Sequence, residues 1–270
     1  MIDLWLAALL FKMAAAAAIV VACSVIAERS GPLLAAMIAT LPISSGPVYV
    51  FLALEHDAAF IAAGSPGSVV ADLANAGFSV GYILMAQRFG TVVSLGTALA
   101  GWLASVVVLR WLALPFLVLV VLLPVVFGAV HLWARPYLAA RPSAPPPRAW
   151  FIIPMRAAIV ALVAGGVTAL SNAAGPSLTG VLATMPVVLS SLCAFLQPRI
   201  GGPATAAVIA NSQLGLIGFG FGLASLHVTA LPLGVWGALA VGLVICVAWN
   251  GMLMALDWRR RTAGARRAQA

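Results

Sequence analysis

Charged side chains are scarce in this sequence. Only 7% of its 270 residues are charged, whereas 64% are hydrophobic. A soluble domain carries about 25% charged residues, so a soluble fold would leave most of this apolar surface in water. The net charge of +8 comes from basic residues between apolar runs, with no basic patch interleaved with exposed aromatics. The composition therefore argues against a soluble domain and against nucleic acid as a partner.

Cysteines and recognisable catalytic motifs are also few. Cys23, Cys193 and Cys246 lie inside apolar stretches without metal-ligand spacing or a disulfide framework, so we interpret them as buried packing residues. The sequence has no nucleophile triad, no metal-ligand cluster and no phosphate-binding glycine loop. We therefore expect no enzymatic activity, no metal and no cofactor.

Long apolar runs are abundant, and a run of about 20 residues can cross a bilayer as a helix. The pattern predicts an all-α polytopic membrane protein. About nine transmembrane helices are expected, near residues 4–27, 31–54, 66–88, 91–110, 112–133, 149–170, 175–196, 204–226 and 231–256.

The basic residues divide unevenly between the two sides of this topology. One side collects most of them, namely Arg29, Arg88, Arg135, Arg141, Arg148, Arg199, Arg259, Arg260, Arg261, Arg266 and Arg267. Cytoplasmic loops are enriched in Lys and Arg, so this side should be cytoplasmic. We expect a bacterial-type inner (plasma) membrane protein with its N-terminus outside and its C-terminus in the cytoplasm.

The chain contains an internal duplication. Residues 31–42 (GPLLAAMIATLP) match residues 175–186 (GPSLTGVLATMP) at a shift of 144, with six of twelve positions identical. After a shorter loop the shift becomes 141, which maps Asp72 onto Gln213. Each copy holds four predicted spans, and the span at 112–133 has no counterpart.

An odd number of predicted spans precedes the second copy, because the span at 112–133 separates the two four-span repeats. The second copy therefore enters the membrane from the opposite side, and the repeats should be inverted. Many secondary transporters are built in this way. The predicted organisation is a first four-helix repeat at 1–111, a linker helix and cytoplasmic loop at 112–148, a second, inverted four-helix repeat at 149–256 and a basic cytoplasmic tail at 257–270.

Phe11-Lys12 near the start of the first span and Pro42 in Ala-Thr-Leu-Pro carry a family likeness. Through these residues each half resembles the small four-span GlpM-type inner-membrane proteins. The second half departs from the pattern, with Met155 and Arg156 in place of Phe11 and Lys12. The resemblance implies a duplicated, fused version of the four-span fold and implies no particular chemistry.

Two cations stand inside predicted spans at equivalent positions, Lys12 and Arg156. Charges at such depth are costly and point to function by default. Snorkelling of the long side chains and a structural ion pair are the alternatives. Asp72 could pair with Lys12, could titrate and couple transport to protons, or could sit wet near the outer interface. Its mate Gln213 is neutral, which would leave Arg156 free to meet an anionic substrate.

Prolines interrupt the second and seventh spans at equivalent positions. A proline inside a helix removes a backbone hydrogen bond, and a broken helix exposes N–H groups that attract anions. An innocuous kink is the alternative. With the two cations, the polar and proline residues here are the predicted substrate-binding set: Lys12, Arg156, Thr40, Pro42, Ser44, Ser45, Thr184, Pro186, Ser190 and Ser191.

Two G-x-x-x-G elements, Gly77/Gly81 and Gly218/Gly222, should allow close helix packing. The whole pattern favours a secondary transporter that moves a small anionic or zwitterionic solute, lipid-linked solutes included, by alternating access between the repeats. The alternative is a non-transporting accessory protein for cell-envelope polysaccharide assembly, and a cation transporter is a third hypothesis. The expected partners are the lipid bilayer and the solute, and a homodimer is left open.

Overall fold

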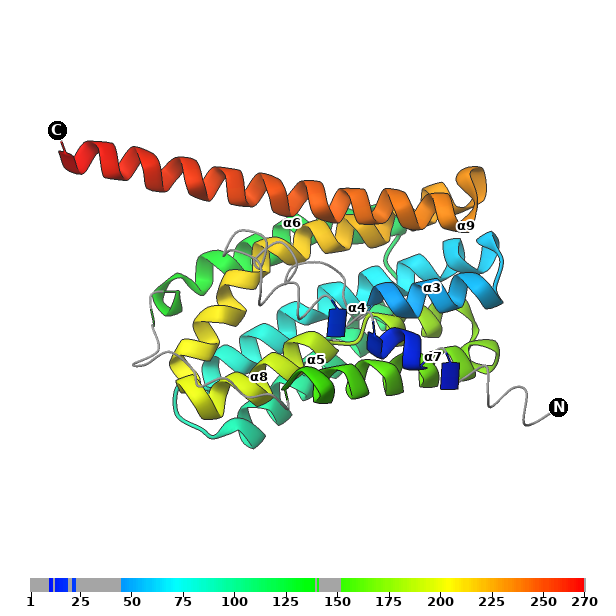
Figure 1. Cartoon of the computed structure of the whole chain (residues 1–270), viewed down its shortest axis with the longest axis horizontal. Helices are drawn as coiled ribbons and strands as arrows, with labels where there is room; N and C mark the ends of the chain where they lie inside the picture. Colours follow the sequence, from blue (N-terminus) through cyan, green and yellow to red (C-terminus); the bar gives the residue numbers. More distant parts are fainter. Residues whose placement is uncertain are drawn as a thin grey trace.

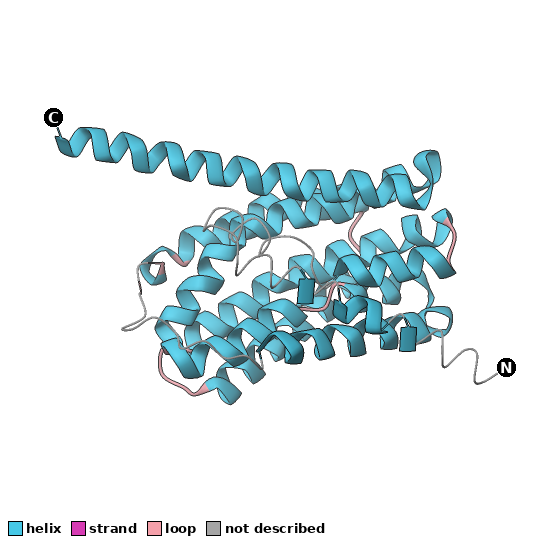
Figure 2. Ribbon diagram, in the orientation of Figure 1, coloured by secondary structure: helices cyan, strands magenta, loops and turns pink. Residues whose placement is uncertain are grey.

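The part of the chain that the computed structural model describes consists of helices joined by short loops and turns (Figures 1 and 2). The described residues are 10–11, 13–18, 21–22, 45–138, 140 and 152–269, without the side chains of 152, 156 and 260–269. No strand occurs in these ranges. The helices are α3 (Ser45–Glu55), α4 (Ala58–Met85), α5 (Thr91–Leu112), α6 (Phe116–Trp133), η1 (Arg135–Tyr137), α7 (Ile152–Ala183), α8 (Val187–Ile200) and α9 (Gly202–Gln269).

Two of these helices contain a sharp change of direction at a glycine. Gly175 in α7 and Gly234 in α9 have φ values of 72° and 70°, a left-handed conformation that glycine adopts at little cost. Beyond Gly234 the chain runs back along the preceding part of α9 (Figure 1), so that Gly222 packs against Gly242. α9 also continues through the segment predicted as a basic tail, which is therefore helical up to Gln269.

α4 begins earlier than the sequence predicted. The backbone N–H of Phe60 donates to Asp57 Oδ1 at 2.9 Å, a helix cap that starts the helix at Ala58 rather than near residue 66. Pro66 then lies inside the helix and leaves the Ala62 carbonyl without its usual donor. The Nδ1 atom of His227 lies 2.9 Å from this carbonyl oxygen and takes the place of the missing N–H. A residue distant in sequence thus makes the proline tolerable.

α4 is the central helix of the described structure, with α5, α6, α7 and α9 packed around it. In the most apolar stretch of α4, 72% of the residues are buried, whereas the corresponding stretches of α5 and α6 are each only 22% buried. The outer helices expose large apolar side chains such as Val92, Trp111 and Leu117. Within the described ranges, five helices are long and apolar enough to cross a membrane. This surface is compatible with a membrane-embedded protein, because lipid is the solvent in which it is stable.

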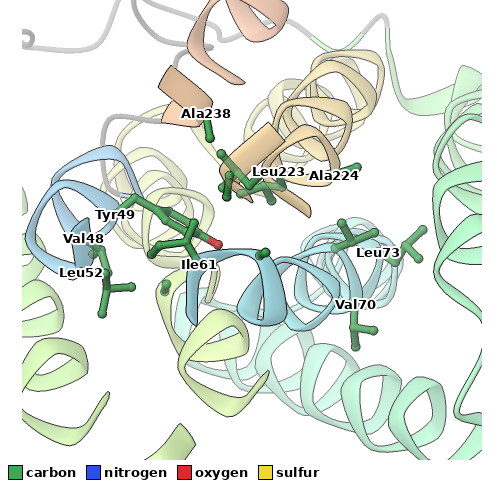
Figure 3. Packing of buried hydrophobic residues seen from close by; sticks show 14 of the residues in the cluster. Val48, Tyr49, Leu52, Ile61, Val70, Leu73, Leu223, Ala224 and Ala238 are labelled. Carbon is green, nitrogen blue, oxygen red and sulfur yellow. The ribbon is translucent and has the colours of Figure 1, made fainter. Parts of the chain in front are cut away.

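The main hydrophobic cluster joins helices from both ends of the sequence. Figure 3 shows Tyr49 of α3 and Ile61 of α4 facing Leu223 and Ala238 of α9. All four side chains are buried. The cluster therefore holds segments of the two predicted repeats against each other.

Glycines allow close backbone contacts inside each predicted repeat. A Cβ at Gly77 of α4 would lie 2.7 Å from the carbonyl oxygen of Gly101 in α5. A Cβ at Gly222 would lie 2.8 Å from the carbonyl oxygen of Gly242, within α9. Gly81 and Gly218 lie at similar close contacts, with the Thr97 backbone and the Trp249 side chain. Helix backbones approach this closely only where a side chain is absent.

A second set of glycines, which the sequence analysis did not single out, lies between the predicted repeats. A Cβ at Gly64 of α4 would lie 3.1 Å from the Pro176 carbonyl oxygen in α7, and Gly67 and Gly180 lie at still closer contacts along the same α4–α7 interface. Gly202, at the start of α9, packs on the Ala86 carbonyl at the other end of α4. The central helix is thus in backbone contact with both neighbours from the second half of the chain.

Candidate functional site

Six buried polar residues run along one face of α4. They recur at alternating spacings of three and four residues, which places them on a single helix face. We call them the α4 polar seam: Ser65, Ser68, Asp72, Asn75, Ser79 and Tyr82. None is more than 3% exposed. Buried polar groups are costly unless they are hydrogen-bonded, so each member needs a partner from a neighbouring helix.

One end of the seam hydrogen-bonds α3, α7 and α9. Ser65 Oγ donates to the Leu223 carbonyl at 2.7 Å, and Ser68 Oγ donates to the Gly180 carbonyl at 2.9 Å. The Tyr49 hydroxyl shares a 2.5 Å hydrogen bond with the same serine. These bonds join elements from both predicted repeats.

The opposite end of the seam is bonded to α8. The Tyr82 hydroxyl donates to Gln197 Oε1 at 2.7 Å, and Gln197 Nε2 donates to the Phe89 carbonyl at 2.9 Å. Gln197 is itself buried. The two ends of the seam are therefore satisfied by direct protein hydrogen bonds.

The middle of the seam is different. Asn75 Nδ2 donates to Asp72 Oδ1 at 3.3 Å, but Asp72 Oδ2 and Asn75 Oδ1 have no hydrogen-bond partner among the described residues. Gln213 of α9 donates from Nε2 to Ser79 Oγ and to the Ile209 carbonyl, and its Oε1 has no described partner. The orphaned atoms are all acceptor oxygens, and no donor or cation of the described residues bonds them.

Asp72 does not lie at an exposed helix end. A wet position near the outer interface was one of the alternatives predicted for it. It is instead the fifteenth of the 28 residues of α4 and is 0% exposed. The discrepancy follows from the start of α4 at Ala58, which moves the middle of the helix to residues 71 and 72.

Asp72 meets α9 at a residue without a side chain. A Cβ at Gly220 would lie 2.6 Å from Asp72 Oδ2 and also within contact of the Leu123 side chain from α6. Oδ2 therefore lies beside the Gly220 backbone of α9 and the Leu123 side chain of α6. The sequence shift of 141 makes Gln213 the repeat equivalent of Asp72 and Gly220 the repeat equivalent of Ser79. Asp72 contacts Gly220, and Ser79 contacts Gln213. The two contacts are therefore related by exchange of the two repeats.

The seam is connected to an interruption between α7 and α8. α7 ends at Ala183 and α8 begins at Val187, so Pro186 stands at the break. Thr184 N donates to the Val181 carbonyl, which leaves the Gly180 carbonyl without its usual helical donor. Two hydroxyls replace it: Thr184 Oγ1 and Ser68 Oγ each donate to Gly180 O at 2.9 Å. Ser68 of the α4 polar seam thus supplies a hydrogen bond that the break in the helix would otherwise leave unmade.

The structure describes only some of the other predicted substrate-binding residues. Ser191 Oγ donates to the Val188 carbonyl, Ser190 N donates to the Pro186 carbonyl, and Ser45 is the buried first residue of α3. The Thr184 and Ser191 hydroxyls at the break therefore bond nearby backbone. The remaining predicted residues lie outside the described residues, namely Lys12, Thr40, Pro42, Ser44 and the side chain of Arg156.

Sequence reasoning singled out Asp72 but missed the seam to which it belongs. The signal was present as six polar side chains at helical spacing within one apolar span. Ser68, Asn75 and Tyr82 could have been found in this way, whereas their partners on other helices, such as Gln197 of α8, could not.

No group of three or more His, Cys, Asp or Glu side chains comes together among the described residues to form a metal site. Comparison of the chain with family models, with curated proteins and with solved structures gives no match. The resemblance to GlpM-type proteins therefore stays a prediction that rests on the sequence motif alone.

Proposed function

We propose that this protein is a secondary transporter that moves a small anionic or zwitterionic solute, lipid-linked solutes included, by alternating access. The observation that carries the proposal is the α4 polar seam, whose middle contains buried acceptor oxygens without described partners. Polar and ionisable groups inside a membrane are expensive and commonly mark a substrate or ion pathway. A protein that only fills a membrane complex could place Leu, Ala or Gly at these positions.

We propose further that the two repeats are inverted and move against each other across the interfaces of α4 with α7 and α9. The exchange of contact partners between Asp72/Gly220 and Ser79/Gln213 supports a pseudo-two-fold relation, in which residue i of one copy meets residue j of the other and j meets i. Such halves rock about a central site in many transporters.

Both ends of this interface are held by hydrogen bonds that cross between the predicted repeats. At one end His56 Nε2 lies 2.7 Å from Ser171 Oγ, and His227 bonds the Ala62 carbonyl. At the other end Tyr82 bonds Gln197. Alternating access would break the contacts at one end while keeping those at the other.

For the solute, we propose the region of the α7–α8 break, with Arg156 and Lys12 selecting a negative group. The backbone N–H groups at the start of α8 add the positive end of a helix dipole. We place the protein in a bacterial-type inner membrane, with the Arg88 end of α4 towards the cytoplasm, on the strength of the basic-residue asymmetry.

The test is a ligand-induced thermal-shift screen of detergent-purified protein against organic anions, amino acids, phosphorylated metabolites and polyprenyl phosphates, followed by uptake of each stabilising compound into proteoliposomes. We expect an anion to raise the Tm of the parent, because binding to the native state alone stabilises it. The effect should vanish in a Lys12→Gln, Arg156→Gln double variant and persist in Arg88→Gln, whose arginine is exposed beyond α4.

A correctly inserted double variant that transports as well as the parent would disprove the assigned solute site. If no compound stabilises the parent and none is taken up, the accessory function becomes the better proposal.

A further inference from the structure

We infer that the Asp72 carboxyl is a proton-binding site and carries the coupling ion of the transport cycle. Its use in coupling rests on the proposed transporter function, but its occupancy by a proton can be measured without any solute. The inference starts from the position of Asp72, fully buried in the middle of the central helix, and from its Oδ2 atom, for which the described part of the chain supplies no hydrogen-bond partner.

An isolated carboxylate in such a place is strongly unfavourable, so it needs a metal cation, a cationic side chain or a proton. A hard metal cation takes about six oxygen ligands. Gly220 and Leu123 lie beside Oδ2, and one carboxamide, that of Asn75, bonds the other oxygen. No group of three or more His, Cys, Asp or Glu side chains that could hold a metal comes together among the described residues, whereas a proton requires no shell.

The hydrogen bonds assign the proton to one oxygen. Asn75 Nδ2 donates to Oδ1, which occupies that oxygen as an acceptor. Protonation therefore forms the O–H bond on Oδ2, and this converts a buried acceptor into a donor. The proton comes from water that enters when the moving halves open one end of the seam. After the halves move, the O–H bond breaks and the proton returns to water on the opposite side.

Few groups of the described residues face Asp72. From α9 the buried thiol of Cys246 is a titratable side chain near it. Leu123 of α6 lies beside Gly220 and the carboxyl, and Asn75 of α4 bonds it. Lys12, predicted as an ion-pair partner, lies outside the described residues. A proton on Asp72 requires a neutral carboxyl, whereas an ion pair with Lys12 requires an anionic one. A measurement of the charge state of the carboxyl therefore distinguishes them.

The experiment is infrared spectroscopy of the purified full-length protein in lipid at neutral pH, with the carbonyl stretch of a protonated carboxylic acid as readout. The chain has only six Asp and Glu residues, which makes assignment practicable. We expect a protonated-acid band that is lost in Asp72→Asn, shifted in Asp72→Glu and kept in Asp57→Asn, where the exposed cap of α4 is the control. Addition of Na⁺ should not change the band.

A carboxylate signal assigned to Asp72 at neutral pH would overturn the inference. If that signal changed in Lys12→Gln, the ion pair would replace it, and if it changed with Na⁺, a metal cation would. Should Asp72→Asn fail to fold, Asp72→Glu still reports the charge state through its band shift.

A second measurement separates this inference from the proposed function. Addition of a solute identified by thermal shift to weakly buffered protein should release or take up a proton, detected with a soluble pH indicator, and Asp72→Asn should abolish the change. Uptake of solute without any proton exchange would overturn the coupling role and leave the transporter intact. A protonated Asp72 without transport of any solute would overturn the transporter and leave the proton site.

Discussion

Asp72 Oδ2 lies directly against the backbone of Gly220, so closely that a Cβ at residue 220 would stand 2.6 Å from it. This contact joins the central helix of the first predicted repeat to its counterpart in the second. A larger side chain at residue 220 would therefore displace the Asp72 carboxyl while leaving Asp72 in the chain.

Gly220→Ala should therefore impair transport while Asp72 itself is retained. The added methyl group would push both the carboxyl and the Leu123 side chain, and overpacking of this kind costs about 1–3 kcal/mol in unfolding free energy. Gly128→Ala is the matched control, because a Cβ at Gly128 of α6 meets nothing within 4 Å. Equal stability and equal uptake in the two variants would show that the Gly220 contact is unimportant.

His227 should be needed only because Pro66 interrupts α4. His227→Phe leaves the Ala62 carbonyl without a donor, and an unsatisfied buried acceptor costs about 1–3 kcal/mol. Adding Pro66→Ala should restore much of this loss, since the new N–H can bond the Ala62 carbonyl within the helix. Thermal unfolding of the two single variants and the double variant measures the effect. If Pro66→Ala gives no rescue, the loss arises elsewhere, such as in the packing of His227 on Phe116.

The Gly180 carbonyl should make Ser68 and Thr184 interdependent. Each hydroxyl donates to this oxygen, so Ser68→Ala or Thr184→Ala alone leaves it one donor. The double variant removes both, and we expect a coupling free energy of about 0.5–3 kcal/mol in a double-mutant cycle. The cycle is measured by denaturant or thermal unfolding in detergent. Strictly additive losses would mean that the two hydroxyls act separately.

Tyr82→Phe should loosen one end of the interface between the predicted repeats. The change removes the hydrogen bond to Gln197 and leaves the ring in place. Cys193 lies in the same buried cluster and reports opening, because a small thiol reagent should modify it faster in the variant. Cys246, buried in α9, serves as the internal control in a Cys23→Ala background. Unchanged labelling of Cys193 would show that this hydrogen bond does not hold the end closed.

Part of the candidate site could be predicted from sequence. Asp72 stood out because a single acid in an apolar span is expensive, whatever surrounds it. Its burial and its place in the middle of α4 could not be predicted, because Pro66 suggested a later helix start and nothing local shows that His227 compensates for this proline. The link between Ser68 and the break at Pro186 depends on a carbonyl 112 residues away in sequence.

The sequence by itself determined that this is an all-helical chain suited to a membrane, because long apolar runs with few charges can satisfy their backbone hydrogen bonds in lipid only as helices. Tertiary structure alone decided which polar groups became partners and which were orphaned. A buried hydroxyl or carboxyl is satisfied by whichever backbone or side chain the neighbouring helix presents, and glycines such as Gly67, Gly202 and Gly220 set how closely that helix approaches. The ends of the α4 seam found donors and acceptors on α7, α8 and α9, whereas Asp72 met a bare helix backbone and a leucine.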